Sequence, residues 1–251
     1  ERYLDDRLYK GAFPRLYDER KPPPPPHVLY ESYIATYLER DVRQLTAVQD
    51  LALFHRFLRL CAARIGQVMN KANLSIECGI SQPTVERWLS VLEASHVIFR
   101  LQPFHANINK RLVKSPKLYF CDTGLACRLI GIQNPQMLEI HPLRGALFEN
   151  LVFSELVKRA LSSGVRPDIH FLRDKTGHEV DFLPAKNGRF LAFEAKSGAT
   201  FRSDYLKDIR FFRNLLGEQL TDAYILYAGD DESRVDGVHI LNAIRYFEDE
   251  K

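Results

Sequence analysis

The stretch EVDFLPAKNGRFLAFEAKSG, residues 179–198, constrains the fold most strongly, because two apolar runs here contain charged residues. The polar Asn-Gly pair between the runs is typical of a tight turn that joins antiparallel strands. Runs this apolar are typical of strands buried in a sheet. Asp181, Glu194 and Lys196 lie within them, and a buried charge needs a partner.

Alternation of side chains along the second run predicts where these charges point. Glu194 and Lys196 are two residues apart and share one face of the strand, whereas Phe193 and Ala195 take the other face. A hairpin brings Asp181, on the neighbouring strand, within reach of the same face. We therefore predict that the three charges converge.

Glu149 adds a fourth charge from a predicted helix over residues 143–161. Its neighbours at +3, +4 and +7 are Val152, Phe153 and Leu156, so its carboxylate lies on the stripe that faces the sheet.

Three carboxylates and one ammonium in one place suit a hard divalent cation, because Mg²⁺ prefers oxygen ligands. Such an ion activates water towards a phosphodiester, and Lys196 can orient that water or neutralise developing charge. The alternative is an ordinary cross-strand ion-pair cluster without metal, with Glu149 favouring the first turns of its helix.

The order of the helices and strands predicted over residues 136–251 indicates an α/β domain with a mixed sheet. Helical spacing and short apolar runs give the order of elements: helix 143–161, strands 169–173, 179–183 and 190–196, helix 203–216, and strands 223–227 and 238–241.

Two further segments precede this domain. Residues 1–29 end in the run Lys21–Pro26, whose five prolines cannot form helix or central strand and are interpreted as a stiff spacer, or alternatively as a ligand for an aromatic groove. Residues 30–135 are predicted to be mainly helical, and Gly79, Ser81 and Pro83 are typical of the turn and cap of a helix-turn-helix.

The second helix of this motif presents Gln82 and Arg87 on its outer face, next to the acids Glu86 and Glu93. Two strands that follow it flank a loop and would form a wing. Residues 101–120 contain no acid and carry four cations that could follow a phosphate backbone, namely Lys110, Arg111, Lys114 and Lys117. DNA contact is one interpretation of this unit, and packing or subunit contact is the other.

Composition limits the remaining function classes. A net charge of +3 favours no partner by itself, and four cysteines without a CxxC pair argue against a zinc module or a disulfide framework. No apolar run approaches the length of a membrane span, and the first residues lack the apolar stretch of a signal peptide, so we expect a cytoplasmic protein without membrane contact. The chain contains no GxxxxGK[ST] phosphate-binding loop.

Several stretches together resemble a known family. RGALFENLVFSEL, RDKTGHEVDFL and FEAKSG resemble the PD-(D/E)xK nuclease superfamily as it occurs in the C-terminal region of predicted prokaryotic AAA+ ATPases, within a domain of unknown function. YIATYLERDVRQL, GISQPTVERWLSVLEASHVIFRL and NKRLVKSPKLYFCDTGLACRLIGI resemble the winged-helix part of the same proteins.

This resemblance implies a restriction-endonuclease-like fold for the second domain and a role for each residue of the cluster. Asp181, Glu194 and the carbonyl of Ala195 would be ligands of Mg²⁺ or Mn²⁺, Lys196 the catalytic lysine, and Glu149 the acid on the first helix.

The resemblance also implies an AAA+ ATPase module, in cis or in trans, because GAFPRLYDE resembles the stretch just after that module. We therefore expect the chain to be a fragment, or a relative without its motor. The predicted function is metal-dependent hydrolysis of DNA, and the alternative is a non-catalytic module that binds DNA or partner subunits.

Overall fold

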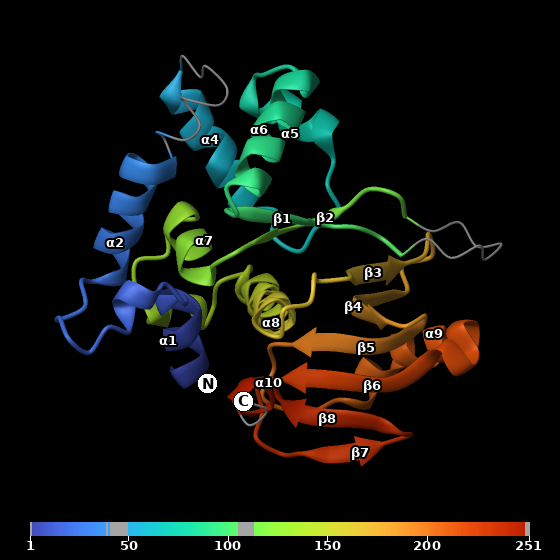
Figure 1. Ribbon diagram of the computed structural model, residues 1–251. Coiled ribbons are helices and arrows are strands. Elements are labelled where there is room, and N and C mark those ends of the chain that lie inside the picture. Colours follow the sequence, from blue (N-terminus) through green and yellow to red (C-terminus); the bar gives the residue numbers. More distant parts are fainter. Residues whose placement is uncertain (1, 39, 41–49, 105–112, 249–251) are drawn as a thin grey trace. The chain divides into compact units, whose positions relative to one another are not determined.

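The computed structural model describes residues 2–38, 40, 50–104 and 113–248 (Figure 1). It divides into two compact units. The helical unit comprises Arg2–Arg100 and Lys117–Asn150, and the sheet unit comprises Leu101–Pro116 and the residues from Leu151 to the C-terminus. The helix α8 (Arg144–Ser162) contributes residues to both.

Short helices make up most of the helical unit. Its described elements are α1 (Arg2–Lys10), η1 (Pro14–Leu16), α2 (Pro26–Tyr33), the π-helical turn η2 (Ile34–Leu38), α4 (Leu51–Ala62), α5 (Lys71–Cys78), α6 (Gln82–Ala94), the paired strands β1 (Ile98–Leu101) and β2 (Lys117–Phe120), α7 (Thr123–Leu129) and η3 (Pro135–Leu138).

The helix-turn-helix predicted from the sequence is confirmed as local structure in α5 and α6. Gly79 ends α5 in the left-handed conformation, with φ of +77°, and the Ser81 hydroxyl caps α6 by accepting from the Thr84 N–H at 3.3 Å. Val85, Leu89 and Leu92 are fully buried, as their spacing predicts.

The sheet unit is a mixed α/β structure, as predicted. Its described elements after α8 are β3 (Ile169–Arg173), β4 (Glu179–Lys186), β5 (Arg189–Lys196), η4 (Ser203–Leu206), α9 (Lys207–Leu216), η5 (Gly217–Gln219), β6 (Leu220–Tyr227), β7 (Ser233–Val235), β8 (Val238–Asn242) and α10 (Ala243–Glu248). The strand order is β3-β4-β5-β6-β8-β7, in which β5, β6 and β8 are parallel and the remaining neighbours are antiparallel. The six strands are drawn in gold to red in Figure 1.

Both faces of this sheet are covered. Phe190 and Ala192 of β5 share a buried cluster with Phe212 of α9. On the opposite face of β5, Phe193 stacks on Tyr224 of β6 with ring centroids 4.8 Å apart. The alternation that the sequence predicts for β5 is therefore present, and it places even-numbered residues on the α9 side.

The two strands expected on either side of the predicted wing pair with each other as β1 and β2. The described residues on either side of the loop, Leu101–Phe104 and Val113–Pro116, belong to the sheet unit, and some of them also pair with its edge strand β3. Phe104 N–H donates to the Phe171 carbonyl at 2.7 Å, and Val113 N–H donates to the Arg173 carbonyl at 3.0 Å. An edge strand presents unpaired backbone groups, and this segment satisfies some of those of β3.

Asp122 anchors the N-terminal segment within the helical unit. Its carboxylate caps α7 by accepting from the Leu125 N–H at 2.9 Å, and its second oxygen accepts from the Ala12 N–H at 2.7 Å. Tyr30 donates to the Lys10 carbonyl at 2.9 Å from the same region. Gly11 lies between them with φ of +68°, and a Cβ there would overlap both the Tyr30 hydroxyl and the Asp122 carboxylate.

We predict that Gly11→Ala destabilises the protein more than Gly79→Ala does. Both glycines have positive φ, so each substitution should lose about 1–2 kcal/mol to backbone strain. Only at residue 11 does the new methyl group meet other atoms within 4 Å, which adds about 1–3 kcal/mol of overpacking. Denaturant unfolding of the two variants measures the difference in unfolding free energy. Equal losses of stability would contradict the close packing of Gly11 against Tyr30 and Asp122.

Candidate functional site

Asp181 and Glu194 lie opposite each other at the point where β4 and β5 part. The backbone pairing of the two strands runs through Phe182 and Phe193, and the same register places Asp181 across from Glu194. Here the Ala195 N–H donates to Asp181 Oδ2 at 2.9 Å, so a carboxylate takes the place of a backbone acceptor. The structure therefore brings these two predicted residues together.

Glu194 is a buried acid with an incomplete set of partners. Its side chain is 3% exposed, and Oε2 accepts from Lys196 Nζ at 2.9 Å. Among the described residues, Oε1 is buried and has no hydrogen-bond partner. Burial raises the pKa of Glu194 well above its usual value and the charge of Asp181 adds to this, whereas Lys196 opposes it. The site therefore favours a proton or a cation beside Glu194.

Asp174 shows how a buried acid of the same unit looks when its role is structural. It lies in the turn between β3 and β4 and is 6% exposed. Both carboxylate oxygens are bonded, to the N–H groups of Thr176 and His178 and to the Thr176 hydroxyl. Burial raises the pKa of Asp174, but these hydrogen bonds outweigh it and the net shift is downward. Burial alone therefore does not explain Glu194.

Glu179 is a neighbour of the cluster that the sequence analysis did not select. It lies two residues before Asp181 on β4, so the two side chains share a face, and a carboxylate oxygen of one lies within 4.8 Å of an oxygen of the other. Arg173 pairs with Glu179 at 3.1 Å. The spacing of two between the acids was the signal available in the sequence.

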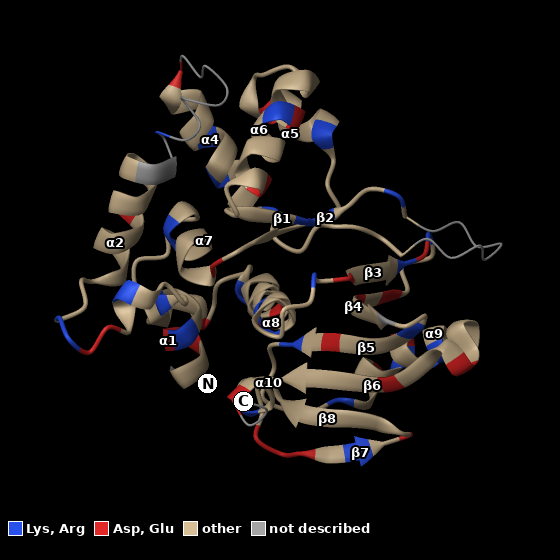
Figure 2. Cartoon of the chain, in the orientation of Figure 1, with Lys and Arg blue, Asp and Glu red and all other residues tan. Residues whose placement is uncertain are grey.

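The donor set suits a hard cation. Within one residue of a strand, N–H and carbonyl point to the same side, so the Ala195 carbonyl is directed to the side of Asp181. Two carboxylates and one carbonyl are ligands of the kind that Mg²⁺ and Mn²⁺ take. Both signs of charge meet at the end of β5 in Figure 2.

Glu149 belongs to the helical unit, where it accepts from Lys117 Nζ at 2.8 Å and from the Tyr119 hydroxyl. This arrangement corrects the prediction for Lys117. Its side chain is only 2% exposed and its ammonium is bound to Glu149, so it is not available to a phosphate. The role of Glu149 as a catalytic acid stays a prediction.

Of the other residues predicted to contact DNA, three are described by the structure and two are not. Gln82 and Arg87 of α6 are exposed, and so is Lys114. Lys110 and Arg111 lie outside the described residues.

Arg100, which the sequence analysis missed, neutralises the acids of α6. Its guanidinium contacts Glu86 at 2.5 Å and Glu93 at 2.5 Å, and Lys71 pairs with Glu86 at 3.1 Å. The hydrogen bond from Arg100 is the largest cause that lowers the pKa of Glu86. These acids therefore repel a phosphate less than the sequence suggests, and Figure 2 shows both colours on α6.

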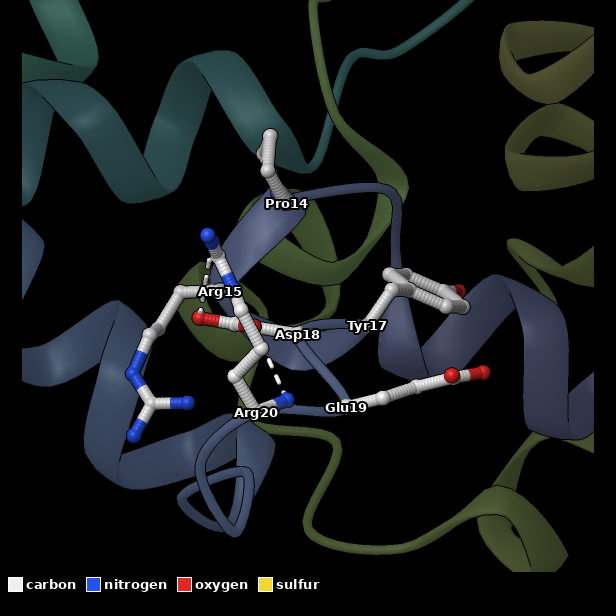
Figure 3. Close-up of a pocket in the computed structure, with 6 residues that line it drawn as sticks. All are labelled: Pro14, Arg15, Tyr17, Asp18, Glu19 and Arg20. Atoms are coloured by element: carbon white, nitrogen blue, oxygen red, sulfur yellow. Dashed lines mark hydrogen bonds and ion pairs between the residues drawn. The ribbon is translucent and has the colours of Figure 1, made fainter.

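A pocket of about 610 Å³ lies elsewhere, in the helical unit (Figure 3). Its lining residues are Pro14, Arg15, Tyr17, Asp18, Glu19 and Arg20. Its charged groups are partly engaged with each other or with backbone, because Arg20 binds Asp18 at 2.9 Å and Arg15 donates to the Pro22 carbonyl at 3.0 Å. We assign it no chemistry.

None of the helices in the described residues combines the length and the apolar character that crossing a membrane requires.

We predict that Glu194→Gln stabilises the fold in a pH-dependent way. Because the folded-state pKa of Glu194 lies above the value of about 4.5 in the unfolded chain, the folded protein holds an extra proton between these two values, and stability falls as pH rises through that interval. Each unit of difference corresponds to about 1.4 kcal/mol. The variant should therefore gain stability at neutral pH and lose that gain as the pH falls to about 4.5.

Unfolding free energies measured across this pH range, with Glu232→Gln as an exposed control, test the assignment. A gain that does not depend on pH would contradict it.

Comparisons with known proteins place the chain in a family. Residues 1–136 match the model described as Domain of unknown function (DUF8612), and residues 144–246 match the model described as Domain of unknown function (DUF4143). The uncharacterized proteins Rv2008c of Mycobacterium tuberculosis and Mb2031c of Mycobacterium bovis are each 34% identical over 170 residues, which is 68% of this chain. The chain covers 38% of the length of each of these curated relatives. Because the first model matches more than half of the sequence, the chain belongs to the DUF8612 family of domains of unknown function.

Proposed function

We propose that the sheet unit hydrolyses phosphodiester bonds of DNA with the help of a divalent metal ion. The observation that carries this proposal is Glu194, whose carboxylate is 3% exposed, faces the charge of Asp181 and has one oxygen without a hydrogen-bond partner among the described residues. A fold does not retain such a group for stability, since a buried charge without a full set of partners is unfavourable.

A divalent ion would resolve this imbalance. Asp181, Glu194 and the Ala195 carbonyl would hold it, and Mg²⁺ or Mn²⁺ fits because all three donors are hard oxygens. When bound, the ion supplies a Lewis acid that polarises the phosphodiester and lowers the pKa of a water molecule.

The protein's own residues have separate tasks in this proposal. Lys196, 32% exposed and bound to Glu194 at 2.9 Å, places a positive charge at the rim of the cluster, where it orients the attacking water or neutralises negative charge that develops on the phosphate. Asp181 is held in place by the Ala195 N–H. The resemblance to PD-(D/E)xK nucleases assigns Glu149 the role of the acid on the first helix.

DNA would be positioned by the helix-turn-helix. Gln82 and Arg87 are exposed on α6, Lys114 is exposed on the segment before β2, and Arg100 offsets the two acids of α6. The resemblance further suggests that the chain works with an AAA+ ATPase module, in cis or in trans. The greater length of the relatives is consistent with such a partner.

We predict that Glu194→Gln and Lys196→Met each lower the cleavage rate by about two orders of magnitude or more, because each removes a charge that acts on the reacting groups. Both substitutions keep the shape of the side chain, so the fold should remain. Cleavage of plasmid and of short branched DNA in Mg²⁺ or Mn²⁺ measures the effect, with Glu232→Gln as the matched control.

Calorimetric titration with Mg²⁺ or Mn²⁺ distinguishes this function from the alternative of a non-catalytic module. Saturable binding that disappears in Glu194→Gln supports the metal site. If the parent neither cleaves DNA nor binds metal, the chain serves as a DNA- or partner-binding module and the cluster is an ion-pair network.

We also predict that Arg100→Gln weakens DNA binding several-fold although Arg100 does not need to touch DNA, because it exposes two carboxylates beside Arg87. Adding Glu86→Gln and Glu93→Gln to this variant should restore the affinity. Fluorescence anisotropy of labelled duplex DNA at fixed salt measures both changes. Failure of the triple variant to recover would show that Arg100 contacts DNA directly or supports the fold.

A further inference from the structure

The Lys196 ammonium has an aromatic neighbour as well as an acidic one. It lies 5.8 Å from the centroid of the Tyr205 ring, on η4, and 2.9 Å from Glu194 Oε2. A cation within about 6 Å of an aromatic ring is attracted by the negative face of the ring. Two elements therefore act on one ammonium.

The hold from Glu194 is not sufficient by itself if the proposed function is correct. If Glu194 also binds a divalent ion, its negative charge is shared between that ion and Lys196. The ion pair between Glu194 and Lys196 then becomes weaker. Lysine has a long flexible stem, and without a second contact the charge would be free to swing away from the cluster. An aromatic ring carries no charge that a divalent ion would take up, so its attraction for the Lys196 ammonium would not weaken when the ion binds.

The backbone that follows β5 is bonded to the end of β6, and Tyr205 is held locally, since its N–H donates to the Arg202 carbonyl at 3.1 Å. The Ala228 N–H, at the end of β6, donates to the carbonyls of Lys196 at 3.2 Å and Gly198 at 3.3 Å. Phe201 packs edge-on against the Tyr205 ring, with centroids 6.1 Å apart.

Gly198 leaves room for the ring. A Cβ at this residue would lie 3.2 Å from the Tyr205 hydroxyl, so an alanine here would push the hydroxyl away by a few tenths of an ångström. Gly198, two residues after Lys196, thus allows Tyr205 to lie close to the end of β5. This close approach is an observation independent of the distance between Lys196 and the Tyr205 ring.

We propose that Tyr205 is the positioning residue of Lys196, holding the ammonium at the cluster through its ring. This proposal rests on the proposed function for its purpose, but the contact itself can be tested without any activity.

Nuclear magnetic resonance provides that test. Lysine-labelled protein should show the Lys196 side-chain protons shifted upfield by the ring current of Tyr205, with Lys196→Arg used to assign the signal. Tyr205→Phe should keep the shift and Tyr205→Leu should abolish it. In Glu194→Gln the shift should persist, because the ring acts independently of the carboxylate.

Gly198→Ala is the matched backbone control. It should reduce the shift in the parent, where the methyl group crowds the hydroxyl, and have less effect beside Tyr205→Phe, which lacks that hydroxyl. A Lys196 signal without ring-current shift in the parent would overturn the proposal, and so would a loss in Tyr205→Phe as large as in Tyr205→Leu.

Cleavage kinetics give the second readout. Tyr205→Leu should lower kcat by about fivefold with little change in KM, as expected from an exposed cation–π contact, and Tyr205→Phe should recover the parental rate. If the parent shows the ring-current shift but neither cleaves DNA nor binds metal, the proposed function fails while the contact stands. If cleavage is present and the two Tyr205 variants are equally active, the ring does not position the lysine.

Discussion

The incomplete hydrogen bonding of one buried carboxylate, that of Glu194, is the constraint on which the site in the sheet unit depends. β4 and β5 pair up to Phe182 and Phe193, and one position further the Ala195 N–H is taken by the side chain of Asp181 instead of by backbone. Glu194 is left buried opposite Asp181, with Lys196 on one oxygen and no hydrogen-bond partner for the other among the described residues. Covering both faces of the sheet with apolar side chains makes this charge unfavourable, and only a proton or a cation relieves it.

Local chemistry was sufficient to predict much of this arrangement. Strand alternation predicted that Glu194 and Lys196 share a face, and the Asn-Gly turn predicted the hairpin that brings Asp181 opposite. The N-cap of α6 and the left-handed glycine that ends α5 could also be predicted, because Ser81 and Gly79 act on backbone atoms within a few residues of themselves. The mixed sheet followed from the order of its elements.

Contacts between distant residues could not be predicted in the same way. The basic segment before β2 indicated a DNA-binding wing, yet Lys117 pairs with Glu149, 32 residues further along, and backbone groups near Phe104 and Val113 pair with β3. Arg100 reaches back 7 and 14 residues to Glu93 and Glu86, a pairing that no periodicity of a single helix encodes. For Lys117, Glu86 and Glu93, a charge that looks available in the sequence is neutralised by a partner from another element.

This pattern of neutralisation is what singles out Glu194. Asp174 is almost as buried, yet hydrogen bonds from Thr176 and His178 satisfy both its oxygens. Glu86 and Glu93 each have a cation within 2.5 Å. Glu194 is less completely paired: Lys196 binds one of its oxygens, is itself 32% exposed and also lies 5.8 Å from the Tyr205 ring centroid, and the other oxygen has no hydrogen-bond partner among the described residues. A lysine that satisfied both oxygens of Glu194 would stabilise the sheet but would leave no carboxylate oxygen for a metal ion and no positive charge at the rim of the cluster for a phosphate. The incomplete pairing is therefore the feature that a site for phosphodiester chemistry requires and that a purely structural ion pair would not retain.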